Sequence, residues 1–257
     1  MNIRVGCQTV KGRGILETLQ EAIRLRGQCF EIFFDGFLPL DISSSRRNQI
    51  YRIARNRDLL LTVHAPLLSL LEKENADSIA ETFTFTTGVR AKVLTIHADP
   101  NYKEFSPKLL EFIHQSQLEE CGVKISIENT PATSPQLLNQ IVEEIRGDFK
   151  KIGVTFDIGH AYLHILEKRT PQKSLQEYLA QLNGPIYEVH AHANNGQEDT
   201  HWSVQKFSER VDMNTVFEYL IQKKNFNGPI ILEYWRENMK KDLDYLDTMI
   251  KGIRVRK

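Results

Sequence analysis

Short apolar runs alternate with amphipathic segments along the whole chain. Helical periodicity, with apolar residues three or four positions apart, marks for example the segments 15–27, 43–58 and 134–148. Runs rich in β-branched and large apolar residues separate such segments and predict strands. These predicted strands are 3–9, 29–34, 59–64, 92–97, 123–128, 152–157, 186–190 and 229–233. The pattern thus predicts eight strands with helix-forming segments between them.

Serine and proline residues mark several of the predicted helix starts. Ser43, Ser106 and Ser134 each stand where a side-chain oxygen can accept a hydrogen bond from a free backbone N–H of the first turn. Pro107 and Pro135 follow two of these serines, at positions where a missing N–H costs nothing. We therefore expect helices to begin directly after the three serines.

The succession of strands and helices predicts a parallel sheet, because parallel neighbours require long crossover connections. Near-continuous apolar strands are typical of a sheet whose outer face is covered by helices. Eight repeats within 257 residues, without a linker-like break, predict the α/β class and a single (β/α)8 TIM barrel domain over residues 1–257. An open doubly wound sheet is the alternative, although such a sheet usually forms its site at one switch point.

Charge and cysteine content narrow the expected partners and compartment. Lys plus Arg (33) equals Asp plus Glu (33), so there is no net attraction for a polyanion, and nucleic acid is a less favoured partner. Cys7, Cys29 and Cys121 lack CxxC spacing and are expected to be small buried residues in a reducing compartment. Neither a signal-like first segment nor an apolar run of bilayer length is present, so we expect a cytoplasmic protein without membrane association.

Acids and imidazoles recur where the predicted strands end. His64, His97, Glu128, Asp157, His190 and Glu233 each lie at or beside the end of an apolar run, and His160 follows Asp157 by three positions. The carboxyl ends of barrel strands meet at one face, so these side chains are expected to converge. Converging carboxylates repel one another unless a cation binds between them. Imidazole and carboxylate without thiolate suit zinc or manganese better than calcium.

The loop after the seventh predicted strand, residues 191–212, is longer and more polar than the other loops. It carries Asp199 and His201, whose spacing directs both side chains to one ion if the segment is extended. His192 is expected to face away from His190 and to lie behind the ligands or at the surface. His114 and His164 fall in helix-like stretches and are interpreted as structural.

The ordered set of strand endings resembles a known family. It contains His-Ala-Pro on the third strand, His on the fourth, Glu-Asn on the fifth, Asp-x-x-His on the sixth, His on the seventh, Asp-x-His in the following loop and Glu on the eighth. The whole chain is similar to the xylose isomerase-like TIM barrel superfamily. That superfamily includes sugar isomerases and epimerases as well as endonuclease IV type AP endonucleases (AP endonuclease family 2).

The resemblance implies a set of metal ligands. In the endonuclease branch, His64, His97 and Glu128 would bind a first ion, and Glu128, Asp157, His190 and Glu233 a second. His160, Asp199 and His201 would bind a third. In the isomerase branch, Glu128, Asp157, His190 and Glu233 would hold one catalytic ion. One to three divalent ions, Zn²⁺ or Mn²⁺, are therefore expected in each chain.

Two chemistries fit this ligand set. In an isomerase or epimerase, Glu128 and Glu233 would face each other across a small sugar or sugar phosphate; one would remove a proton and the other return it through an enediolate. In a phosphodiesterase, a multinuclear zinc site would promote attack of water on phosphorus. The loops favour the isomerase, because the first loop offers only Lys11 and Arg13 for a nucleic-acid backbone.

Further residues are candidates for contact with a substrate. Segment 30–40 lacks a basic insertion, and Leu67 follows His-Ala-Pro where the endonuclease branch commonly has Tyr. Trp202 and Trp235 are candidates for packing on a sugar face, and Lys11 or Arg236 for binding an anion, although ordinary surface positions are the default for all four. A dimer or tetramer is compatible with such barrels.

Overall fold

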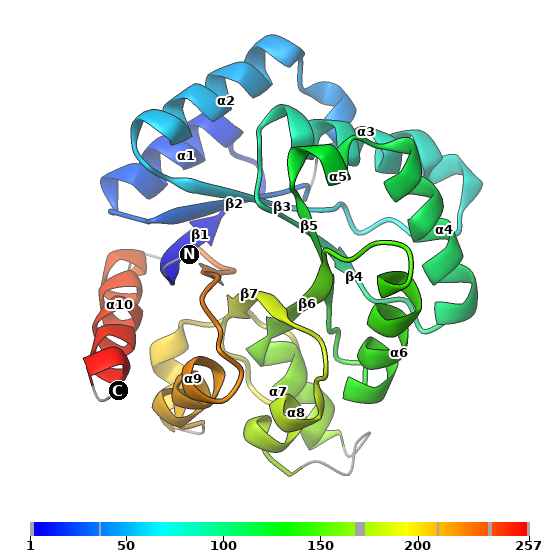
Figure 1. Ribbon diagram of the computed structural model, residues 1–257. Helices are drawn as coiled ribbons and strands as arrows, with labels where there is room; N and C mark the ends of the chain where they lie inside the picture. Colours follow the sequence, from blue (N-terminus) through cyan, green and yellow to red (C-terminus); the bar gives the residue numbers. More distant parts are fainter. Residues whose placement is uncertain (1–2, 36, 168–172, 210, 236–237, 256–257) are drawn as a thin grey trace.

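Eight parallel strands close into a barrel in the order of the sequence, with β1 pairing with both β2 and β8 (Figure 1). The computed structural model describes residues 3–35, 37–167, 173–209, 211–235 and 238–255, and the statements below refer to these residues. The strands are β1 (Arg4–Gln8), β2 (Cys29–Phe33), β3 (Leu60–His64), β4 (Val93–His97), β5 (Lys124–Glu128), β6 (Ile152–Asp157), β7 (Ile186–Ala191) and β8 (Pro229–Leu232). The predicted (β/α)8 TIM barrel is confirmed.

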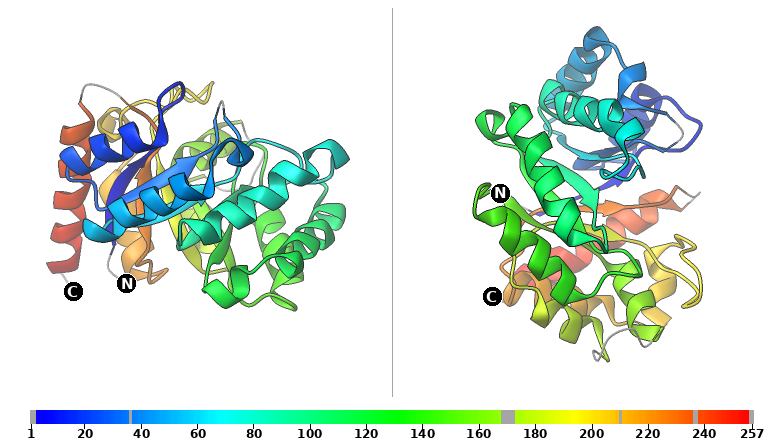
Figure 2. Two further views of the ribbon diagram at one scale, coloured as in Figure 1. Left: turned by 90° about the horizontal axis from the view of Figure 1, so that it is seen from above. Right: turned by 90° about the vertical axis from the view of Figure 1, so that its right-hand side faces the viewer.

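Helices surround the barrel and cover the outer face of its strands (Figures 1 and 2). They are α1 (Ile15–Arg24), α2 (Ser44–Asn56), α3 (Ala76–Gly88), α4 (Tyr102–Gln115), α5 (Leu118–Cys121), α6 (Pro135–Arg146), α7 (Ile158–Leu166), α8 (Leu175–Gln181), α9 (Met213–Gln222) and α10 (Met239–Val255). Short 3-10 helices lie in three loops: η1 (Pro39–Asp41), η2 (Lys73–Asn75) and η3 (Val204–Glu209).

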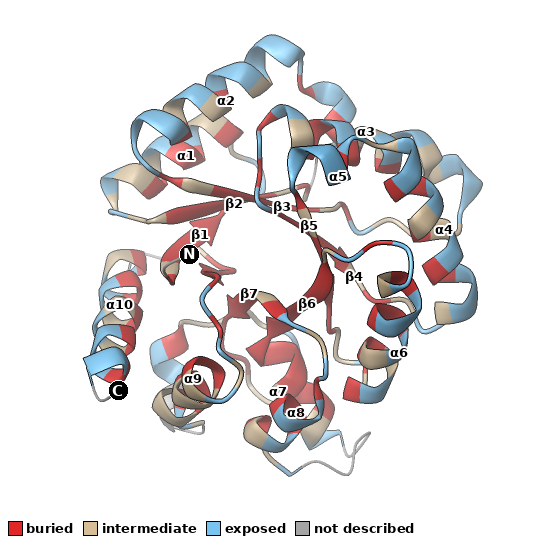
Figure 3. Ribbon diagram, viewed as in Figure 1, coloured by how far each residue is buried: buried red, intermediate tan, exposed pale blue. Residues whose placement is uncertain are grey.

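Each helix buries one stripe of apolar residues against the barrel. In α1 the buried residues Ile15, Leu19 and Ala22 are spaced by four and three positions, which places them on one helical face. Figure 3 shows the same division throughout the fold, with buried strands inside and exposed outer faces on the helices. The main core therefore lies between the strands and the ring of helices.

Two of the three predicted helix caps are confirmed, and the third is wrong. Ser43 Oγ accepts from the N–H of Arg46, and Ser134 Oγ from the N–H of Leu137, at 3.4 and 3.2 Å. Ser106 instead lies inside α4, which begins at Tyr102. The buried face of α4 starts at Phe105, so burial of this ring extends the helix ahead of the serine.

Pro107 therefore lies inside α4, beyond the first turn in which we expected it. Two of the three cysteines, Cys7 and Cys29, are buried as expected, whereas Cys121 at the end of α5 is exposed. All three are free thiols.

The interior of the barrel is polar on several strands, although branched apolar side chains fill most barrels of this kind. Alternate residues of a strand point to the same face. In β4 these inward positions are Thr95 and His97, and in β7 they include Glu188 and His190. Thr95 Oγ1 donates to Glu188 Oε2 across the barrel at 2.8 Å, which shows that these positions face the interior. A polar column thus continues from the mouth into the barrel.

Glycine at position 6 permits the close approach of β1 and β2. A Cβ atom at Gly6 would lie 1.9 Å from the carbonyl oxygen of Cys29, so the strands would have to separate.

Gly6→Ala is expected to lower the free energy of unfolding by about 3 kcal/mol. Gly252→Ala is the matched control: in α10 the added methyl meets no atom within 4 Å, and it should raise stability by roughly 0.5–1 kcal/mol. Urea unfolding of both variants tests this, and equal stabilities would contradict it.

Candidate metal centre

The strand-end acids and imidazoles converge at the carboxyl end of the barrel. His64, His97, Glu128 and Asp157 are the last residues of β3, β4, β5 and β6, and Glu233 directly follows β8. The register places neighbours level with one another, for example His97 beside Glu128. The parallel direction of the strands therefore gathers residues that are far apart in the sequence.

Glu128 lies at the centre of this arrangement and is fully buried. Its Oε2 is 2.8 Å from His64 Nε2 and 3.2 Å from His97 Nε2. Its Oε1 is 3.2 Å from His190 Nδ1 and 3.5 Å from His160 Nδ1. One carboxylate thus contacts four imidazoles, and each of its oxygens faces two ring nitrogens.

A second group of ligand atoms forms around Asp199, in the loop after β7. Asp199 Oδ2 is 2.9 Å from His160 Nε2 and 3.0 Å from His201 Nε2. The nine predicted ligands therefore fall into two adjoining groups, one around Glu128 and one around Asp199. The two groups meet at His160, whose Nδ1 lies 3.5 Å from Glu128 Oε1 and whose Nε2 lies 2.9 Å from Asp199 Oδ2.

Backbone carbonyl groups fix the orientation of several imidazoles. Nδ1 of His64 is 2.7 Å from the carbonyl oxygen of Ala65, and Nδ1 of His160 is 2.9 Å from that of Asn129. Nδ1 of His201 likewise lies 2.8 Å from the carbonyl oxygen of Glu233. In each ring Nδ1–H donates outward and Nε2 points into the cluster. This is the usual arrangement of a metal-binding histidine and its outer partner.

The expectation that His192 faces away from the ligands is wrong. Residues 188, 190 and 192 are two positions apart, so a continuing strand places all three on the same face. His192 is fully buried, and its Nε2 lies 3.1 Å from Asp157 Oδ1, 3.6 Å from Asp199 Oδ1 and 3.9 Å from Glu233 Oε2. It therefore joins both groups of ligand atoms. The two-residue spacing in His-Ala-His was the signal in the sequence.

Gly159, at the start of α7, makes room for His192. A Cβ atom at Gly159 would lie 2.1 Å from His192 Cε1, so any larger residue would displace the ring. The rings of His192 and His201 are stacked, with centroids 3.9 Å apart. His192 is thus held between the start of α7 and the loop that carries Asp199.

The residues present fit a divalent transition ion. Oε2 of Glu233 is buried and accepts no hydrogen bond from the described residues. Ligand atoms lie within 4.8 Å of one another in each of several sets, among them His64, Glu128, His190 and Glu233; His160, His192, Asp199 and His201; and Asp157, His192 and Glu233. Nitrogen and carboxylate oxygen without thiolate match zinc or manganese.

The charges of the cluster favour ionised carboxylates and protonated imidazoles when no metal is bound. Burial opposes ionisation of Glu128, but His190, His97 and His64 hold its pKa well below the usual range. Burial likewise opposes charge on His64, yet Glu128 raises the pKa of His64 to about 9. The hydrogen bond to Asp199 overcomes burial and raises the pKa of His201 to about 9. A metal ion would therefore replace protons when it binds.

The candidate substrate-contacting residues lie around the mouth, with one outside the described residues. Trp235 Nε1 donates to the carbonyl oxygen of Gln8 at 2.6 Å, at the end of β1. Trp202 lies under the Lys206 ammonium group, 4.6 Å from the ring centroid. Lys11 forms an ion pair with Asp35 at 2.9 Å. Arg236 lies outside the described residues.

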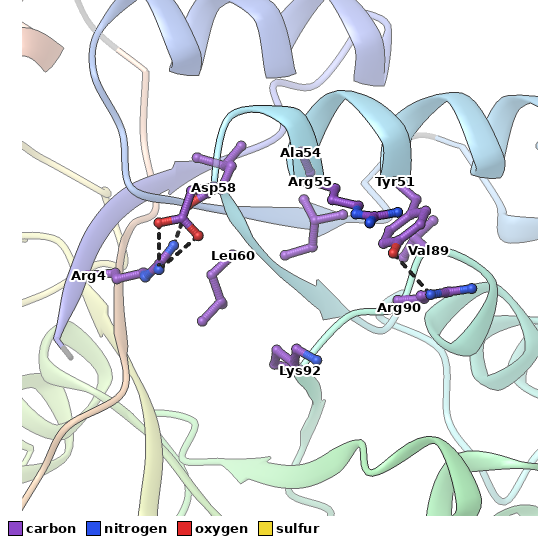
Figure 4. A pocket seen from close by; sticks show the side chains of 11 residues that line it. Arg4, Tyr51, Ala54, Arg55, Asp58, Leu60, Val89, Arg90 and Lys92 are labelled. Carbon is purple, nitrogen blue, oxygen red and sulfur yellow. Dashed lines mark hydrogen bonds and ion pairs between the residues drawn. The ribbon is translucent and has the colours of Figure 1, made fainter. Parts of the chain in front are cut away.

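A hollow of about 500 Å³ lies at the opposite end of the barrel (Figure 4). Arg4 and Leu60, which line it, begin β1 and β3, so the hollow is at the amino ends of the strands. Its carboxylate, Asp58, is bound by Arg4 at 3.0 and 3.2 Å, and no histidine is among its described lining residues. It is therefore separate from the cluster at the mouth and offers no comparable metal ligands.

The fold and the cluster place the chain in a known family. Residues 19–253 match the model of the xylose isomerase-like TIM barrel family, and the chain belongs to that family. An uncharacterised protein of Methanocaldococcus jannaschii, MJ1614, is 26% identical over 93% of this chain and 90% of its own length.

Solved structures with low sequence identity share the fold. D-psicose 3-epimerase from Clostridium cellulolyticum is 13% identical, with a TM-score of 0.66 over 97% of this chain and 96% of that chain. Endonuclease IV from Thermus thermophilus is 15% identical, with a TM-score of 0.67 over 99% of this chain and 100% of that chain. Within the described residues, no helix has the length and apolar character needed to cross a membrane.

The stability of the metal-free protein is expected to fall as the pH rises from about 6.5 to about 9. The folded-state pKa values of His64 and His201, about 9, exceed the ordinary value of 6.5. Their stabilising contribution is therefore complete below pH 6.5 and is lost as the pH rises through 9. Thermal unfolding of chelator-treated protein at pH 6, 7.5 and 9 measures this loss. Metal-loaded protein should not show it, and equal stability of the chelated protein at pH 6 and 9 would refute the prediction.

His192→Asn is expected to weaken metal binding by roughly 10-fold or more, because it removes a nitrogen that contacts both ligand groups. Gly159→Ala should have a similar effect, since the added methyl displaces the His192 ring while every ligand is retained. Gly147→Ala is the control, because its methyl would meet ordinary contacts at 3.7 Å. Competition with a metal-sensitive dye gives the affinities. Unchanged binding in both His192→Asn and Gly159→Ala would remove His192 from the site.

Proposed function

We propose that this chain is a divalent-metal-dependent isomerase or epimerase that acts on a small sugar or sugar phosphate by proton transfer. The main support for this proposal is a pair of carboxylates at the mouth. Glu128 is the last residue of β5, and Glu233 directly follows β8. Their oxygens lie 3.2 and 3.1 Å from the same nitrogen, His190 Nδ1, and belong to one set of ligand atoms within 4.8 Å. Two carboxylates so placed suit a reaction that removes a proton and returns it.

The two glutamates differ in their surroundings, which supports different roles. Glu233 is 5% exposed, and its buried Oε2 has no hydrogen-bond partner among the described residues, so proton transfer to this oxygen would break no existing hydrogen bond. Glu128 is fully enclosed by imidazoles, which can relay a proton to or from it. A bound divalent ion would polarise the substrate carbonyl and stabilise negative charge on its oxygen.

The rim of the mouth supports a small substrate. A hollow of about 200 Å³ beside His97 is lined mainly by apolar side chains, including Leu67, Leu68 and Phe105. This volume is below that of pockets for drug-sized ligands. Gln8 is buried at the end of β1, and its Oε1 has no partner in the described part of the chain, which leaves an unused hydrogen-bond acceptor directly beneath the mouth. The half-buried Trp235 beside it supplies an apolar face.

A zinc-dependent phosphodiesterase of the endonuclease IV type is the second candidate. The observation in its favour is the additional ligand group around Asp199, with His160 and His201, beyond the ligands that one catalytic ion requires. A DNA-binding role requires cations at the rim to contact phosphates. The two cations of the first loop are both paired, Lys11 with Asp35 and Arg13 with Glu17, which favours the small-molecule reaction.

Solvent exchange separates the two candidates. In deuterium oxide, the metal-loaded protein is expected to incorporate deuterium at the carbon next to the carbonyl of a ketohexose or ketose phosphate from a panel. NMR and mass spectrometry measure the incorporation. Cleavage of an abasic duplex without exchange into any sugar would overturn the isomerase proposal and support the phosphodiesterase. Protein that contains no transition metal and gains no activity from zinc or manganese would contradict both.

Glu233→Gln is expected to lower the exchange rate by roughly 100- to 10,000-fold, because the amide cannot accept the proton. Glu128→Gln should have a comparable effect. Glu198→Gln is the matched control: it changes an exposed acid in the loop that carries Asp199 and should leave the rate unchanged. Folding of each variant is checked by thermal unfolding, and a Glu233→Gln protein that folds and retains full exchange would disprove the role of this carboxylate.

A further inference from the structure

A second group of ionisable side chains lies inside the barrel, below the mouth. Glu31 on β2 and Glu188 on β7 are both fully buried, as is His190 on β7. β2 and β7 stand on different sides of the barrel (Figure 1), so the side chains meet across its interior. His190 Nε2 lies 3.3 Å from Glu31 Oε1. This trio is distinct from the nine ligands predicted at the mouth except for His190.

Hydrogen bonds leave part of this interior group unsatisfied. Glu188 Oε2 accepts from Thr95 Oγ1 at 2.8 Å, but Glu188 Oε1 has no hydrogen-bond partner among the described residues. Glu31 Oε2 is likewise buried, and no described residue donates to it. Buried polar atoms without partners are costly and rare in native proteins. Two carboxylate oxygens in one interior region therefore point to a missing electropositive group.

The charges around Glu31 and Glu188 also indicate that a positive group is missing. Among the described residues, no lysine or arginine forms an ion pair with Glu31 or Glu188. The positive charge available from His190 is shared, because its Nδ1 also faces Glu128 and Glu233 at 3.2 and 3.1 Å. Two fully buried carboxylates without a compensating charge are costly, so the pair requires a further positive charge. A divalent cation would balance the two interior carboxylates and leave His190 neutral.

The geometry suits an ion of the zinc type. One ligand atom from each of Glu31, Glu188 and His190 lies within 4.8 Å of the other two. Zinc binds carboxylate oxygen and imidazole nitrogen at about 2.0–2.2 Å, so its ligand atoms lie within about 4.4 Å of one another. Small side-chain adjustments bring the three atoms to this spacing.

We propose that Glu31, Glu188 and His190 bind a divalent transition-metal ion inside the barrel, as a site separate from the centre at the mouth. His190 binds this ion through Nε2, and its Nδ1–H donates to Glu128 or Glu233. His192 then supplies the imidazole at the mouth that His190 was predicted to supply. The interior ion would thereby fix the position of both mouth glutamates through one ring. The site goes beyond the proposed reaction and does not depend on which reaction the mouth performs.

An anomalous-scattering map tests the site directly. Crystals of the full chain, purified without chelators and soaked in zinc chloride, are measured above and below the zinc absorption edge. A peak between Glu31, Glu188 and His190, resolved from peaks at the mouth, is the expected result. Peaks at the mouth with none in the interior would overturn this inference alone. An interior peak with an empty mouth would overturn the proposed metal-dependent reaction alone, and no peak at either position would overturn both.

Metal content in solution provides an independent measurement. Glu188→Gln is expected to lose about one zinc per chain relative to the natural sequence, by elemental analysis after dialysis against a fixed free-zinc concentration. Thr155→Val is the matched control, because Thr155 belongs to the same interior hydrogen-bond chain but contributes no proposed ligand. Asp199→Asn should lose metal from the mouth and keep the interior peak. Equal zinc content in Glu188→Gln and the natural protein would contradict the proposal, and the map on the natural protein decides the question if Glu188→Gln does not fold.

Discussion

The barrel depends on the balance of charge among carboxylates that have been removed from water. Glu128 is enclosed and has no lysine or arginine among its described contacts; its partners are four imidazoles, three on strands β3, β4 and β7 and one in the first turn of α7. Several of these imidazoles are in turn shared with another acid, so His160 contacts Asp199 and His190 contacts Glu233. Because these pairs are not self-contained, the protonation state of one member affects the others. A bound cation is the simplest way to satisfy such a network in a dry interior.

The scaffold supports this network with neutral hydrogen bonds. Asn129 follows Glu128 in the chain; its side chain donates to the carbonyl oxygen of Asp157 and accepts from the Asp157 backbone N–H, both at 2.9 Å. Asp157 also caps α7 through the N–H of His160. The ends of β5 and β6 and the start of α7 are thus held together by hydrogen bonds to backbone groups. The positions of these side chains therefore follow from the backbone, so binding of a metal would require little rearrangement of the chain.

The two ends of the barrel have different chemical character. At the mouth, most of the imidazoles and carboxylates are buried and share partners, whereas His97, Asp199 and His201 are about one-third exposed. At the amino ends of the strands, the ion pair between Arg4 and Asp58 and the contact between Arg90 and Tyr51 lie at the surface, where pairs contribute little to stability (Figure 4). The equal numbers of basic and acidic residues are therefore distributed unevenly. Histidine and carboxylate side chains gather at the mouth, whereas arginine and lysine side chains line the solvent-exposed hollow at the amino ends of the strands.

The sequence by itself determined the repeating strands and helices, the closed barrel and the residues that gather at its mouth, because periodicity and strand-end position are local properties. It could not determine what the tertiary structure decided. The start of α4 depended on burial of Phe105, and the role of His192 depended on strand continuation past Ala191 and on space above Gly159. The meeting of Glu31 with Glu188 depended on contact across the barrel, which no spacing in the chain records. Apolar patterns fix which residues form each element; closure of the barrel fixes which buried charges must share a partner.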